Sequence, residues 1–93
     1  MNFPISFFGN IIEGTGIVSD ISINGCAFVT EAPLTEKSIV RLALRISDEL
    51  QLVDIEAAVV RHVRQGRVGI EFLRVQQAER QRLQLFIRGL RRK

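Results

Sequence analysis

Apolar side chains recur at every second position over most of this 93-residue chain. The clearest case is 39–46, where Val40, Leu42, Leu44 and Ile46 alternate with residues that include Arg41 and Arg45. A period of two is typical of a strand with one face on the core and one toward solvent. Short polar connections between such stretches favour antiparallel pairing. Similar stretches predict about six strands in all, at 3–8, 15–21, 26–30, 39–46, 52–63 and 68–72.

Beyond Gln76 the apolar period changes from two to that of a helix. Leu83, Phe86, Ile87 and Leu90 follow the spacing i, i+3, i+4, i+7, which predicts an amphipathic helix over about 76–90. Short antiparallel strands followed by one helix favour an all-β domain, either a barrel or a sandwich, with the helix packed on it. The alternation within 52–63 breaks near Val60-Arg61, which predicts a β-bulge.

Size and composition narrow the class of protein. Ninety-three residues suit a single domain with one modest core. The one cysteine, Cys26, excludes an intrachain disulfide, and with a single histidine, His62, the chain is poorly suited to a zinc site. Residues 1–12 are apolar but lack the basic residues and cleavage site of a signal peptide, and they are too few to span a membrane. We therefore expect a cytoplasmic protein.

No catalytic constellation is recognisable. Neither Cys26 nor Ser22 stands in a motif that would pair it with His62 as nucleophile and base, so we expect no enzyme activity. Cys26 is interpreted as a buried structural thiol and His62 as a partly exposed strand residue.

A polar turn separates two of the apolar stretches, with the sequence Asp20-Ile21-Ser22-Ile23-Asn24-Gly25. Side chains of Asp, Ser and Asn bind nearby backbone N–H groups, and glycine at such a place is expected to supply a φ above zero. The turn therefore predicts a tight connection between paired strands. A second segment, Val59-Val60-Arg61, is followed after a short turn by Gly69-Ile70-Glu71-Phe72.

These two segments resemble the signatures of PilZ domains, the bacterial receptors for cyclic di-GMP, over about residues 15–90. The resemblance implies a small six-stranded antiparallel β-barrel with one C-terminal helix, and a single domain over 1–93. It also makes Asp20, Ser22, Asn24 and Gly25 candidate ligand-binding residues, with Arg61 as a further candidate for the same groove. Cyclic di-GMP is the implied ligand, and neither a metal nor another cofactor is implied.

The chain departs from the family at one motif. Ligand-binding members carry Arg-x-x-x-Arg upstream of the polar turn, whereas here no Lys or Arg precedes Lys37. Guanidinium groups clamp phosphates and read guanine, and losing two such contacts lowers affinity by about 10²–10⁴-fold. Two other pairs have the same spacing, but we interpret Arg41/Arg45 as a solvated strand surface and Arg88/Arg92 as a helix C-terminus.

The function that this combination favours is a PilZ-type adaptor, with weak or lost nucleotide binding, that contacts proteins in motility, pilus or biofilm control. The Phe-rich stretch at 1–12 is expected not to fit inside so small a barrel and to leave an exposed apolar strand as a docking edge, to a protein partner or a second copy. One alternative is a true cyclic di-GMP receptor with substitute arginines. Another is a nucleic-acid-binding barrel, since residues 74–93 carry seven Lys/Arg against one Glu, although the rest of the chain is acidic.

Overall fold

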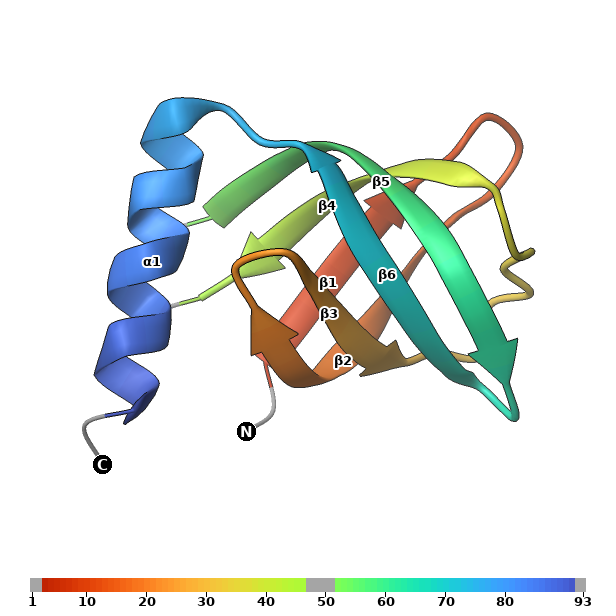
Figure 1. The fold of residues 1–93 in the computed structure, drawn as a ribbon. Helices are drawn as coiled ribbons and strands as arrows, with labels where there is room; N and C mark the ends of the chain where they lie inside the picture. The colour runs from red at the N-terminus through yellow and green to blue at the C-terminus, as the bar shows by residue number, and fades with distance from the viewer. Residues whose placement is uncertain (1–2, 47–51, 92–93) are drawn as a thin grey trace.

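The computed structural model describes residues 3–46 and 52–91, which form a closed antiparallel β-barrel with a C-terminal helix (Figure 1). The order of strands around the barrel is β1-β2-β3-β6-β5-β4, and β4 pairs back onto β1. The predicted all-β, six-stranded barrel with one terminal helix is confirmed. The elements are β1 Phe3–Phe8, β2 Glu13–Ser22, β3 Gly25–Val29, β4 Ile39–Arg45, β5 Leu52–Arg64, β6 Arg67–Arg74 and α1 Gln77–Arg91.

The core fills the barrel with the apolar half of each alternating strand. On β4, Val40, Leu42 and Leu44 are buried while the arginines between and after them face solvent. Phe7 and Phe28 are both fully buried, with ring centroids 5.8 Å apart. Burying such side chains stabilises the fold by about 1.5–3 kcal/mol each, so the period of two in the sequence directly encodes the inside of the barrel.

The expectation that the Phe-rich stretch leaves an apolar strand as a docking edge is wrong for β1, although Phe8 and Ile11 are exposed. Phe3, Ile5 and Phe7 are buried, and β1 is paired with β2 on one side and with β4 on the other. Three large apolar side chains gain more from the barrel interior than from the surface, and β1 takes the position that closes the ring. Pro4 fits there because the pairing with β4 begins one residue later, at Ile5.

The pairing of β5 with β6 contains two register shifts. One lies between Val60 and His62 and leaves Arg61 as the extra residue on β5, which confirms the predicted bulge. At the other, the neighbouring residues Ala57 and Ala58 pair with Arg74 and Phe72, so the extra residue is Leu73 on β6. The sequence pattern did not indicate this second shift. As a result of the shift after Val60, the consecutive residues Arg61 and His62 are both exposed on the outer face.

Helix α1 lies across one end of the barrel (Figure 1) and covers it with the predicted apolar stripe. Leu83 is fully buried, and the ring of Phe86 meets that of Phe3 edge-on at 5.2 Å. Glu79 also fixes the helix, since its Oε1 accepts the backbone N–H of Asp54 at 2.9 Å. Within residues 3–46 and 52–91, no helix combines the length and the apolar content needed to cross a membrane.

Candidate functional site

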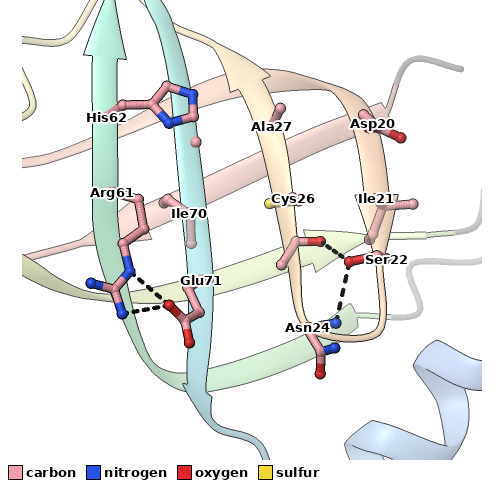
Figure 2. Close-up of a pocket in the computed structure, with 12 residues that line it drawn as sticks. Asp20, Ile21, Ser22, Asn24, Cys26, Ala27, Arg61, His62, Ile70 and Glu71 are labelled. Atoms are coloured by element: carbon pink, nitrogen blue, oxygen red, sulfur yellow. Dashed lines mark hydrogen bonds and ion pairs between the residues drawn. The ribbon is translucent and has the colours of Figure 1, made fainter.

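An open groove of about 370 Å³ runs over the outside of the barrel where β2, β3, β6 and β5 lie side by side. Its volume is at the lower end of the range for small-molecule sites. The groove brings together all five residues predicted from the sequence, namely Asp20, Ser22, Asn24, Gly25 and Arg61. Figure 2 labels four of them, all but Gly25. Their role in binding a ligand remains a prediction.

The β2–β3 hairpin forms one wall of the groove. Ser22 and Gly25 pair directly, so Ile23 and Asn24 make a two-residue turn. The hydroxyl of Ser22 accepts the backbone N–H of Asn24 and donates to the carbonyl of Gly25, both at 3.3 Å. The tight turn predicted from the sequence is therefore present, and the Ser22 hydroxyl is already engaged within it.

Gly25 is required for a reason other than the expected one. Its φ is not positive; the residues with positive φ in the described chain are Lys37, Gln65 and Gly66. Instead, a Cβ on Gly25 would lie 2.3 Å from the backbone carbonyl oxygen of Ile70 on β6. The glycine thus permits close approach of β3 and β6, and the prediction of a φ above zero at this position is wrong.

The opposite wall is an ion pair between neighbouring strands. Nε and Nη2 of Arg61 lie 2.6 and 2.5 Å from Oε1 of Glu71, as Figure 2 shows. The two side chains are 57% and 47% exposed, so the pair borders solvent and can exchange for other partners. Glu71 also lies directly opposite Gly25 in the register of β3 and β6, which places its carboxylate beside the polar turn.

Small residues form the floor of the groove. Ala27 and Gly69 pair directly across β3 and β6, and Gly69 pairs with His62 on β5. A Cβ on Gly69 would lie 2.2–2.8 Å from atoms of the His62 ring, so the imidazole lies against the glycine. Neither His62 nor Glu71 was predicted from the sequence to line the site; the register of β3, β6 and β5 brings them there.

Cys26 lies beneath this floor and is buried, as the sequence interpretation expected. Burial, with a smaller contribution from the charge of Asp20, raises the pKa of the thiol from 9.0 to about 12. Because the thiolate is the nucleophile, this thiol is chemically inert near neutral pH.

Carboxylates outnumber guanidinium groups in the lining of the groove. Its lining residues supply the carboxylates of Asp20 and Glu71, and its only guanidinium, that of Arg61, is paired with Glu71. Among the residues that the structure describes, no three His, Cys, Asp or Glu side chains come together as metal ligands would.

The other arginine pairs with the family's spacing lie elsewhere. Arg41 binds Asp54 through two hydrogen bonds of 3.0 and 2.7 Å, and Arg45 is exposed on the same strand, β4. Arg88 is exposed on α1, and Arg92 lies outside the described residues. None of the three described arginines lines the groove.

Comparisons with known proteins agree on the fold. The family model of the PilZ domain matches residues 1–89. Among solved structures, the Bacillus subtilis inhibitor of motility MotI/DgrA is 22% identical with a TM-score of 0.79, and the match covers 100% of this chain and 49% of MotI/DgrA. The PilZ domain of CeSA from a cellulose-synthesising bacterium is 17% identical with a TM-score of 0.75, and the match covers 98% of this chain and 94% of the CeSA domain. The chain thus spans about half the length of MotI/DgrA, and no curated protein sequence matches it.

Proposed function

The chain belongs to the PilZ domain family, and from that premise we propose that it is a non-catalytic binding module of cyclic di-GMP signalling whose own affinity for the nucleotide is weak or lost. It acts by contacting a protein partner in the bacterial cytoplasm, in the control of motility, pili or biofilm. A structural neighbour that is itself an inhibitor of motility supports this setting.

The observation that carries the proposal is the pairing of Arg61 with Glu71. A cyclic dinucleotide brings two phosphate charges, and in this groove the one available guanidinium is already neutralised. Asp20 adds a further carboxylate. At about 5 Å, the carboxylate of Asp20 repels a phosphate by about 1–3 kcal/mol for an effective dielectric constant between that of water and that of a protein surface, whereas the charges of Glu71 and Arg61 largely cancel. This repulsion adds to the loss of the family's arginine motif.

Calorimetric titration of cyclic di-GMP into the purified chain, with GTP as the control ligand, tests the proposal. We expect no saturable heat up to several hundred micromolar nucleotide. Low-micromolar binding would refute the proposal and favour a true receptor with substitute arginines; in that case Arg61→Ala should abolish binding.

A double variant tests the electrostatic reasoning itself. Asp20→Asn with Glu71→Gln removes both carboxylates and frees Arg61, so the affinity for cyclic di-GMP should rise at least tenfold above that of the unaltered chain. Glu13→Gln with Glu31→Gln is the matched control, because both are exposed carboxylates that do not line the groove and the double change alters the net charge equally. An equal change in the control would show that net charge, and not the groove, determines binding.

A further inference from the structure

A row of four exposed side chains crosses the outer face of the barrel next to the groove. Ile17 of β2 pairs with Val29 of β3, Val29 pairs with Arg67 of β6, and Arg67 pairs with Arg64 of β5. Residues directly opposite each other in antiparallel strands point to the same face of the sheet. With strands about 4.8 Å apart, this outer row is about 14 Å long.

One half of the outer row is apolar. Ile17 and Val29 are 48% and 49% exposed, although each belongs to a strand whose other face fills the core. Val29 also separates two hollows of about 360 and 520 Å³, the first lined by Ile17 and the second by Arg64 and Arg67. Adjacent β-branched side chains beside such hollows provide apolar area for a partner to cover.

The other half of the outer row consists of two arginines that lack an ion-pair partner among the described residues. Arg64 and Arg67 face each other directly across the β5–β6 hairpin, and like charges in that position destabilise a sheet. Within the described part of the chain, neither arginine forms an ion pair with a carboxylate. An acidic partner would convert this repulsion into attraction.

The backbone that presents the two arginines is well fixed. Gln65 and Gly66 both have positive φ, at 53° and 81°, as a tight two-residue hairpin turn requires. The backbone N–H of Thr30 donates to the carbonyl of Gly66 at 2.9 Å, and its hydroxyl donates to the carbonyl of Thr15 at 2.8 Å. Figure 1 shows this hairpin turn at the end of the barrel away from α1. The outer row is therefore preorganised for binding.

We propose that the outer row is a docking surface for a protein segment that carries apolar side chains next to Asp or Glu. The apolar part of the segment covers Ile17 and Val29, and its carboxylates pair with Arg67 and Arg64. The exposed carboxylate of Glu31 lines the hollow at the Ile17 end, so it sets this direction by repelling acidic residues there. About four or five extended residues, or about nine or ten helical ones, match the length of the row.

The apolar half decides between a protein and a phosphate ligand. A free nucleotide or a nucleic-acid backbone gains mainly from the two arginines, whereas an acidic segment with apolar anchors uses the whole row. The inference rests on the proposed function, since it names the kind of protein that the module contacts. It places that contact beside the groove and not in it.

A peptide library tests the proposal on the full chain. A library of random 16-residue peptides displayed on phage is selected on the immobilised chain at physiological salt, and the affinities of individual peptides are measured by fluorescence anisotropy. We expect selected sequences to combine Leu, Ile, Val or Phe with neighbouring Asp or Glu. Their affinity should fall at least tenfold for Arg64→Gln with Arg67→Gln, and at least fivefold for Ile17→Ser.

The controls separate docking from general charge and from misfolding. Arg45→Gln, an exposed arginine of β4 outside the row, should leave peptide affinity within twofold. Removing Arg64 and Arg67 also removes a like-charge repulsion, so the double variant should melt no lower than the unaltered chain. Failure to enrich any peptide, enrichment without acidic residues, or unchanged affinity for the double variant would overturn the proposal.

Two further ligands distinguish the failures. If a single-stranded 20-nucleotide DNA binds through Arg64 and Arg67 more tightly than every selected peptide, the docking surface is for nucleic acid and the proposal is overturned. Tight binding of cyclic di-GMP that is unchanged in the Arg64/Arg67 variant would instead refute the proposed function. The peptide measurements would still show whether the outer row is a docking surface.

Discussion

The two glycines that line the groove, Gly25 and Gly69, should respond very differently to the same substitution by alanine. A Cβ at Gly25 meets the carbonyl oxygen of Ile70 at 2.3 Å, and this atom belongs to the backbone of β6. A Cβ at Gly69 meets ring atoms of His62 at 2.2–2.8 Å, but His62 is an exposed side chain that can rotate toward solvent. Only the first clash requires two paired strands to move apart.

The expected magnitudes follow from this difference. Overpacking against backbone costs about 2–3 kcal/mol, which for a domain of this size lowers Tm by about 10–20 °C in Gly25→Ala. Gly69→Ala should change stability by less than about 0.5 kcal/mol, since a surface side chain absorbs the change. Thermal unfolding followed by circular dichroism, with urea unfolding at 25 °C as the second measure, checks both. Equal losses in the two variants would refute the distinction between backbone and side-chain contact.

Three other predictions concern the rest of the barrel. The pKa of the Cys26 thiol is about 12 in the native chain and near 9.0 in the unfolded one. The free energy of unfolding should therefore fall as pH rises above 9, by about 2 kcal/mol at pH 10.5. Urea unfolding at pH 8 and pH 10.5 should show this loss in the unaltered chain and not in Cys26→Ala. Gln65→Asn should raise the free energy of unfolding by about 0.5–1 kcal/mol, because Asn tolerates its positive φ better; an unchanged urea midpoint would contradict this. Leu83→Ala should lower the free energy of unfolding by about 2–4 kcal/mol in the same assay, because Leu83 is fully buried. Leu85 is 66% exposed, so Leu85→Ala should lower it by less than about 0.5 kcal/mol. Similar losses in the two variants would show that α1 is not anchored as described.

Much of the fold could be read from local patterns. The alternation on β4 and the helical spacing of Leu83, Phe86 and Ile87 each depend on neighbours in the chain, and both elements lie where they were predicted. The position of β1 could not be read in this way. Whether a Phe-rich strand ends a sheet or closes a ring depends on its pairing with residues near Leu44, about forty positions later.

The residues of the candidate site also differ in whether a local sequence pattern could identify them. Asp20, Ser22, Asn24 and Gly25 occupy one hairpin, so a sequence motif can identify them together. The partner of Arg61 could not be identified, because Glu71 reaches it only through the pairing of β5 with β6. That register depends on a bulge whose presence the sequence indicated but whose effect on neighbouring side chains it did not. The charge balance of the groove is therefore a property of the assembled sheet.

The closure of β1 between β2 and β4 also has a consequence during protein synthesis. A ribosome adds about 5–20 residues per second, so residue 44 follows residue 5 by about 2–8 s. Until then, Phe3, Ile5 and Phe7 belong to a strand with one unpaired side and no complete core to enter. The nascent chain thus passes through a brief interval in which this Phe-rich strand can meet other chains, and the arrival of β4 ends that interval.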